Sequence, residues 1–443
     1  MRGLMSIFKA YDIRGIVGEE LDEAIAHKIG EAFATLIKPK TVVIGRDMRP
    51  HSPALSAALA RGLLVQGVDV IDLGQVSTPM CYFANGRLNA DASIMVTASH
   101  NPGEYNGFKL CRARAVPISG DTGIRDLEAL VRERAFRPRP EQRGLMRTHD
   151  IVPAYREHIQ SFAQLQRPLR IAVDYANAMG IAEAVVLQGL LEMDPLFDTY
   201  DGSFPNHEAN PLDPHTYEHL SAHVRKGNFD FGIAFDGDAD RVGFVDENGD
   251  IISMDMITAL IARSLLQAEK GIVFYDLRSS KAVKELIEAE GGEARMSRVG
   301  HAFIKAQLRE ANALFAGELS GHYYFRENYF TESSGLAALL IANLVSASGQ
   351  PLSALVAPIC KYAASGEINS RVKNPAAVFA ALRDAYPEAR SFELDGLSME
   401  FPTWWFNVRM SNTEPLCRLN LEADTEAEMV RHRDALLALI RAC

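Results

Sequence analysis

Three aspartates spaced two residues apart are the first pattern in the sequence that could carry chemistry. Asp236, Asp238 and Asp240 follow directly after the apolar residues 231–235. On an extended backbone, side chains two residues apart point the same way, so the three carboxylates would lie together. Such a group repels itself unless a cation neutralises it, and oxygen ligands of this kind suit Mg²⁺. A solvated acidic turn is the alternative.

The same segment does not fit a calcium-binding EF-hand loop. Glu247 does occupy the twelfth position counted from Asp236, as that loop requires. The sixth position is Arg241, however, where the tight turn of an EF-hand needs glycine. The flanking residues also indicate strands rather than helices, so we expect a magnesium loop.

A serine in a short polar loop is the second candidate. Ser99 lies within residues 97–102, where Asn101-Pro102 predicts a turn. Serine is a weak nucleophile that needs a base or a metal ion to activate it. His100 is a poor candidate for this base, because neighbouring side chains usually point apart. Local chemistry alone favours a turn or a helix cap here.

Two further loops carry groups that bind sugars or phosphates. Residues 317–322 hold an acid, a hydroxyl and an imidazole on alternating positions, which suits sugar hydroxyls. Residues 409–413 combine an arginine, two hydroxyls and an amide in a turn, which suits phosphate. Solvated surface groups and a capped turn are the respective alternatives. Surface charge would likewise explain Tyr11 and Arg14 beside a glycine, and Lys109 after the serine loop.

The elements that precede these loops form a repeated pattern. A short apolar strand ending in aspartate, a helix and a further strand occur three times. The expected helices are residues 52–66, 181–191 and 280–289. After each unit another apolar strand leads into the serine, aspartate or 317–322 loop. Such βαβ units predict largely parallel sheets, with ligands beyond the carboxyl ends of the strands. The three loops could therefore share a cleft, although unrelated surface turns are the alternative.

Length and pattern together predict four domains, because 443 residues are too many for one core. Residues 1–150, 151–247 and 248–363 form three similar α/β domains with mixed, largely parallel sheets. Residues 364–443 form a smaller α+β domain that ends in an amphipathic helix.

Composition limits the partners that we expect. The net charge of −11 argues against a protein that coats nucleic acid or an anionic membrane. No apolar run approaches the ~20 residues of a transmembrane helix, and no signal peptide is evident. Five scattered cysteines without a CxxC pair favour reduced thiols and a cytoplasmic setting.

Taken together, these residues resemble the α-D-phosphohexomutase family of phosphomannomutases and phosphoglucomutases. Residues 9–15 are similar to the family's opening motif, 97–102 to its phosphoserine loop and 236–241 to its metal loop. Residues 317–322 are similar to its sugar loop, and 409–415 to its phosphate loop. The loops follow the family's order over the whole chain, which implies four domains around a central cleft.

The resemblance implies that Ser99 carries a phosphate and donates it to a hexose 1- or 6-phosphate. The resulting hexose 1,6-bisphosphate, an intermediate and activator, would return its other phosphate to Ser99. Mg²⁺ would bind Asp236, Asp238, Asp240 and a phosphate oxygen on Ser99. Arg241 would neutralise charge on the transferring group.

Other positions acquire roles only through the resemblance. Proton transfer could fall to Arg14, His100, Lys109 or His322, which a sequence cannot rank because it gives no distances. The expected substrate-binding residues are Tyr11, Arg278, His301, Glu318, Ser320, His322, Arg409, Ser411, Asn412 and Thr413. Arg278 stands where a close bacterial relative has lysine, and residues 331–333 stand where relatives often have an aspartate pair.

The expected activity is the interconversion of hexose 1-phosphate and hexose 6-phosphate by a monomer or dimer. Mannose phosphate is favoured, and glucose phosphate is possible. Phosphoglucosamine mutase is a rival, but Leu319 and Asn412 differ from its loops. A phosphatase and a non-catalytic sugar-phosphate-binding regulator are further rivals. A regulator would need neither Ser99 nor the three aspartates.

Overall fold

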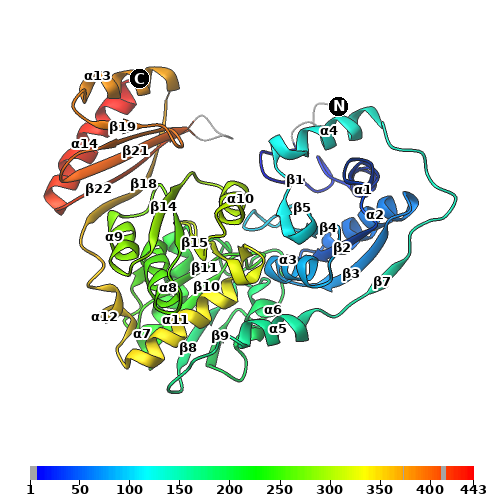
Figure 1. Ribbon diagram of the computed structural model, residues 1–443, viewed down its shortest axis with the longest axis horizontal. Helices are drawn as coiled ribbons and strands as arrows, with labels where there is room; N and C mark the ends of the chain where they lie inside the picture. The colour runs from blue at the N-terminus through cyan, green and yellow to red at the C-terminus, as the bar shows by residue number, and fades with distance from the viewer. Residues whose placement is uncertain (1–6, 373, 411–415) are drawn as a thin grey trace.

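The computed structural model describes residues 7–372, 374–410 and 416–443. Four sheets with their own helices follow one another along the chain. The blue-to-cyan first domain lies opposite the orange-to-red last domain, and the green-to-yellow part of the chain joins them (Figure 1). Among the described residues, no helix is long and apolar enough to cross a membrane.

The first domain is built on a sheet whose central strand β2 has a parallel neighbour on each side. Its strands are β1 (Ile13–Ile16), β2 (Thr41–Arg46), β3 (Asp69–Gln75), β4 (Ala92–Val96), β5 (Tyr105–Arg112), β6 (Val116–Pro117) and β7 (Met146–Thr148). Its helices are α1 (Glu23–Ile37), α2 (Ser52–Val65), α3 (Thr78–Arg87) and α4 (Ile124–Glu133). Strand β5 runs antiparallel to β4, so the sheet is mixed.

The second domain repeats this plan on a five-stranded sheet in the order β12-β11-β10-β8-β9. Its strands are β8 (Arg170–Asp174), β9 (Glu192–Leu196), β10 (Phe231–Phe235), β11 (Val242–Val245) and β12 (Ile251–Ile252). Its helices are α5 (Val152–Gln160), α6 (Gly180–Glu183) and α7 (Glu218–Lys226). The helix expected over residues 181–191 is shorter, because a tight 3₁₀ turn follows α6 and Gly189 adopts a positive φ of 80°.

The third domain has the sheet order β14-β13-β15-β16-β17. Its strands are β13 (Ile272–Asp276), β14 (Glu293–Ser297), β15 (Phe315–Gly317), β16 (Tyr323–Phe325) and β17 (Thr331–Glu332). Its helices are α8 (Met254–Ala268), α9 (Lys281–Ala289), α10 (His301–Ala311), α11 (Ser334–Ser348) and α12 (Leu352–Val356). Strand β13 pairs in parallel with both β14 and β15, and β16 pairs antiparallel.

The fourth domain is an antiparallel sheet in the order β18-β22-β21-β20-β19. Its strands are β18 (Ala363–Arg371), β19 (Arg390–Phe392), β20 (Leu397–Glu400), β21 (Trp404–Met410) and β22 (Leu416–Ala423). Its helices are α13 (Pro375–Ala385) and α14 (Glu426–Ala442). The expected α+β character is confirmed, whereas the exact domain boundaries stay predictions.

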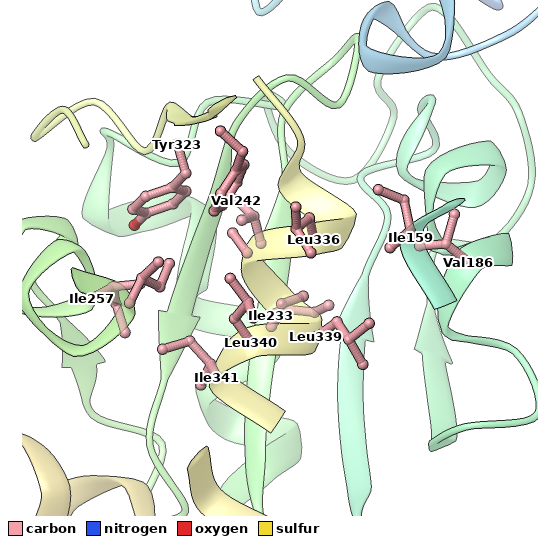
Figure 2. Packing of buried hydrophobic residues seen from close by; sticks show 14 of the residues in the cluster. Ile159, Val186, Ile233, Val242, Ile257, Tyr323, Leu336, Leu339, Leu340 and Ile341 are labelled. Atoms are coloured by element: carbon pink, nitrogen blue, oxygen red, sulfur yellow. The ribbon is translucent and has the colours of Figure 1, made fainter. Parts of the chain in front are cut away.

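Helix α11 joins the second and third domains into one apolar core. Leu336, Leu339, Leu340 and Ile341 project from it among apolar side chains of the neighbouring strands and helices (Figure 2). A helix that is apolar on nearly all sides is stable only when it is buried. This shared packing fixes the strand ends of the two domains relative to each other.

Candidate active site

The serine loop and the aspartate loop meet at the ends of β4 and β10. Ser99 Oγ donates a hydrogen bond to Asp236 Oδ2 at 3.0 Å. A Cβ at Gly237 would lie 2.2 Å from the Ser99 carbonyl oxygen, so the two backbones touch and only glycine fits between them. Ser99 has a φ of 53°, in the left-handed region that costs an ordinary residue about 1 to 2 kcal/mol.

Arg49 holds the serine loop in this conformation. Its buried guanidinium donates to the carbonyl oxygens of Ser99, Asn101, Pro102 and Tyr105 at distances of 2.6–2.9 Å. These bonds offset the strain at Ser99 and turn its side chain toward the aspartate loop. The sequence offered no signal for this role, because an isolated arginine is usually a surface residue.

The strand-ending aspartates of the three repeats are turn caps. The carboxylates of Asp47, Asp174 and Asp276 each accept a hydrogen bond from the backbone N–H two residues later, at 2.8–3.1 Å. This is the local bond by which aspartate favours a turn after a strand. The repeated pattern therefore marks how each strand ends, and the chemistry lies in the neighbouring loops.

The aspartate loop brings its three carboxylates together in a buried place. Asp236, Asp238 and Asp240 each place an oxygen within 4.8 Å of the others. One oxygen of Asp238 and one of Asp240 have no hydrogen-bond partner among the described residues. Thr78 Oγ1 donates to the other oxygen of Asp238 at 2.6 Å. Unpaired buried carboxylate oxygens are the donors that a small divalent cation prefers, so the residues fit Mg²⁺.

The charges around this loop shift the pKa values of its members in opposite directions. Burial, together with Asp240 and Asp238, raises the pKa of Asp236 well above its usual range. Burial would also raise the pKa of Asp240, but Lys109 and His322 hold it well below that range. Lys109 Nζ lies 2.6 Å from Asp238 Oδ2 and 2.5 Å from Asp240 Oδ2. Lys109, together with Arg241 beside Asp236 and His322 beside Asp240, thus neutralises much of the negative charge of the loop.

His100 lies closer to Ser99 Oγ than its sequence position suggested. Its Nδ1 is 3.3 Å from Ser99 Oγ, because the left-handed backbone of Ser99 turns the two neighbouring side chains toward each other. Burial and the nearby cations Arg241, Arg14 and Lys109 lower the pKa of His100 well below its usual value. The imidazole is therefore neutral at pH 7 and can accept a proton or a hydrogen bond.

The loop of residues 317–322 is tied to the aspartate loop through His322. Ser320 Oγ lies 2.8 Å from His322 Nδ1, and His322 Nε2 lies 3.5 Å from Asp240 Oδ1. Burial lowers the pKa of His322, but Asp240 and Glu318 reverse this and raise it to about 9. Burial conversely raises the pKa of Glu318, which its bond to His322 then brings down to about 2. Both groups are charged at neutral pH. Arg241 Nε lies 3.3 Å from His322 Nε2.

Three arginines converge where the third and fourth domains meet. Glu367 accepts from Arg409 Nη2 at 2.8 Å and from Arg418 Nη1 at 3.4 Å, and it lies 3.7 Å from Arg278 Nη1. Arg278 also makes a forked contact with Asp276. The sequence missed Glu367, whose role depends on contacts across the domain boundary. Ser411, Asn412 and Thr413 lie outside the described residues.

The other predicted residues near the serine loop and the third domain include Arg14, Tyr11 and His301. Arg14 donates to Asn101 of the serine loop at 2.5 Å. The rings of Tyr11 and His301 meet edge to face, with 5.7 Å between their centroids. Glu332 is buried and pairs with Lys305 Nζ at 2.6 Å. Glu332, Asp240 and His322 also place possible ligand atoms within 4.8 Å of one another.

Comparison with known protein families covers nearly the whole chain. The phosphoglucomutase/phosphomannomutase α/β/α domains I, II and III match residues 5–138, 153–249 and 253–362. The C-terminal domain of the same family matches residues 367–439. Four such domains around one site define an α-D-phosphohexomutase, and the chain belongs to the phosphoglucomutase/phosphomannomutase family.

Individual relatives narrow the comparison. The chain is 39% identical to a protein of Escherichia coli named phosphomannomutase, over 99% of both chains. It is 42% identical to a phosphomannomutase of Salmonella typhimurium, over 98% of this chain and 99% of the relative. A crystal structure of a phosphoglucomutase/phosphomannomutase family protein from Burkholderia thailandensis superposes with a TM-score of 0.91. That protein is 34% identical, and the match covers 99% of this chain and 97% of the other.

Proposed function

We propose that this mutase interconverts hexose 1-phosphate and hexose 6-phosphate through a phosphate carried on Ser99, with mannose phosphate preferred and glucose phosphate accepted. One observation supports the proposal above all others: Ser99 Oγ lies 3.0 Å from Asp236, at the edge of a buried aspartate cluster. The proposed phosphate carrier therefore lies next to the residues proposed to bind the metal ion. The name phosphomannomutase given to similar proteins supports mannose phosphate rather than glucosamine phosphate as the proposed substrate.

In the proposed transfer, the bond between phosphorus and Ser99 Oγ breaks as a sugar hydroxyl oxygen bonds to phosphorus. Mg²⁺, held by Asp236, Asp238, Asp240 and a phosphate oxygen on Ser99, would neutralise charge on the transferring group. Arg241 adds fixed positive charge beside it. The product is a hexose 1,6-bisphosphate, whose other phosphate returns to Ser99 after the sugar turns over.

The charge states of the candidate groups separate their roles in proton transfer. Lys109 and His322 are cations at neutral pH, which suits charge stabilisation. The raised pKa of Lys109 makes it a weaker proton donor than His322, whose pKa is about 9. His100 is neutral and lies against Ser99 Oγ, so it can accept a hydrogen bond from that hydroxyl, but its lowered pKa makes it a weak base. Arg14 stays charged and orients the serine loop through Asn101.

The groups expected to bind substrate fit a two-ended ligand. Glu318 and Ser320 would meet sugar hydroxyls, and Tyr11 and His301 would border the sugar. Arg278, Arg409 and residues 411–413 would hold the phosphate that is not transferred, in either orientation of the sugar. We further propose a cytoplasmic monomer or dimer that takes hexose 1,6-bisphosphate as its activator.

Replacement of the carrier tests the proposed function. Ser99→Ala should lower mutase turnover by about 10³-fold or more, because no other group can carry the phosphate. Ser161→Ala, at an exposed serine bonded to the His158 carbonyl, is the matched control. Isomer formation and phosphate release are measured together on mannose, glucose and glucosamine 1-phosphates. Near-normal turnover of Ser99→Ala without added bisphosphate would contradict the proposal, and phosphate release exceeding isomer formation would indicate a phosphatase.

A further inference from the structure

A buried carboxylate lies where the first three domains meet. Glu183 ends helix α6 of the second domain and is fully buried. Its Oε2 accepts a hydrogen bond from Ser77 Oγ of the first domain at 2.5 Å. Its Oε1 accepts from Tyr155 OH at 2.7 Å and from the N–H of Gly335, in the third domain, at 3.1 Å. One side chain therefore bonds all three domains.

Two of these bonds come from the N-termini of helices. Ser77 is the N-cap residue of α3. Gly335 lies in the first turn of α11, whose N-cap residue is Ser333. Helix N-termini carry partial positive charge and unpaired N–H groups, both of which stabilise a buried carboxylate. A Cβ at Gly335 would lie 2.9 Å from Glu183 Oε1, so glycine permits this close approach.

The same two helix ends hold the aspartate loop. Thr78, directly after Ser77, donates from its hydroxyl to Asp238 Oδ2 at 2.6 Å and from its N–H to the Asp238 carbonyl at 3.0 Å. Ser334 Oγ donates to the carbonyl of Ala239 at 2.6 Å. Two chains of short bonds thus lead from one carboxylate to the middle of the aspartate loop.

An ionised carboxylate suits this buried position because both of its oxygens accept hydrogen bonds. Among the described residues only neutral donors bond Glu183, and burial raises its pKa to about 7. Burying a charge without a cationic partner is costly. A glutamine would avoid that cost, but its NH₂ group cannot accept the hydrogen of Ser77 Oγ, so the hydroxyl would have to turn and accept instead. Only the ionised carboxylate accepts from all three donors.

We propose that Glu183 is a positioning residue for the divalent cation. It holds the N-termini of α3 and α11 at the separation at which Thr78 and Ser334 set the aspartate loop for binding. Glu183 itself touches neither substrate nor cation. The inference rests on the metal role of Asp236, Asp238 and Asp240 given in the proposed function.

Direct binding of Mn²⁺ to the full chain tests this inference without reference to turnover. Free Mn²⁺ is measured by electron paramagnetic resonance for the wild type, Glu183→Gln and the control Glu31→Gln. Glu31 is also a buried carboxylate, but its partners Gln66 and Arg139 lie outside the loop. Glu183→Gln should bind Mn²⁺ about tenfold more weakly, the usual loss when support of a metal ligand is removed. Glu31→Gln should bind it as the wild type does.

A double-mutant cycle separates positioning from general stability. Thr78→Val keeps the side-chain shape and removes one link, so it should weaken Mn²⁺ binding by itself. Combined with Glu183→Gln, the loss should be clearly less than the product of the single losses, because both act on one chain of bonds. If Glu183→Gln does not fold, Ser77→Ala replaces it in the cycle, with a smaller loss expected.

The outcomes that overturn the inference differ from those that overturn the proposed function. Wild-type affinity in folded Glu183→Gln or Ser77→Ala, within about twofold, contradicts the positioning role, as does strict independence in the cycle. Failure of the wild type itself to bind Mn²⁺ would instead contradict the metal role of the aspartate loop.

Discussion

Lys109 shows how one side chain can have opposite effects on metal binding and on transfer. Burial would lower its pKa, but Asp238 and Asp240 raise it, so the ammonium is charged at neutral pH. At 2.5–2.6 Å from one oxygen of each of two carboxylates, its positive charge opposes the binding of a cation to their other oxygens. In the proposed transfer, this ammonium would stabilise the charge on the phosphoryl group.

Replacement of this lysine should therefore separate the two effects. Lys109→Met should lower the transfer rate by about 10²- to 10³-fold, as for other lost charge stabilisers in active sites. The same variant should bind Mn²⁺ more tightly than the wild type. Single-turnover transfer and Mn²⁺ titration measure the two quantities, with exposed Lys284→Met as the control. Equal weakening of both would show that Lys109 only maintains the structure of the loop.

At the scale of elements, the site depends on two strand ends pressed together. The loops after β4 and β10 come from different domains, and their backbones touch between Gly237 and Ser99. Because β10 shares a core with α11, the aspartate loop has little freedom to retreat. A single methyl group at this contact must therefore displace the serine loop.

Gly237→Ala should lower turnover by about 10²-fold, the usual effect of displacing a reacting group by about 1 Å. Its circular dichroism spectrum should match that of the wild type, because the change affects only the contact between two loops. Gly120→Ala is the control, since the nearest atom to its added Cβ would be 3.4 Å away. Wild-type turnover in Gly237→Ala would show that the contact does not position Ser99.

Across the whole molecule, the fourth domain is attached differently from the other three. It has an apolar core of its own. Its recorded contacts with the third domain include polar bonds of Glu367 with Arg278 and of Glu422 with the N–H of Lys281. Interfaces of this polar kind allow domains to move relative to each other. Substrate phosphate bound between Arg278 and Arg409 would hold the two domains together.

Arg278→Lys tests this coupling, since lysine keeps the charge but loses the fork that meets Asp276 and reaches toward Glu367. The KM for hexose phosphate should rise by about tenfold with kcat little changed, because binding is affected more than transfer. Arg326→Lys is the matched control, at a forked contact with Glu269 outside the site. A fall in kcat at unchanged KM would contradict the proposed anchoring role.

The four domains and the order of their loops could be predicted from the sequence, because strand–helix patterns and short motifs depend on neighbouring residues. It did not predict Arg49, Thr78, Glu183 or Glu367, whose partners lie far along the chain. Thr78 and Asp238, for example, are 160 residues apart. It also placed His100 away from Ser99, because a left-handed backbone at a serine is not visible in residue type. Contacts between residues of different domains could not be predicted from the sequence alone.

The central claim is that Ser99 carries the phosphate, and mass spectrometry tests it most directly. The purified protein is treated with glucose 1,6-bisphosphate, digested and compared with untreated protein and with Ser99→Ala. The account predicts one added phosphate on the peptide that contains Ser99, and no such addition in Ser99→Ala. Phosphate on a different peptide, or no phosphate at Ser99 either before or after treatment in protein that is active as a mutase, would contradict the account.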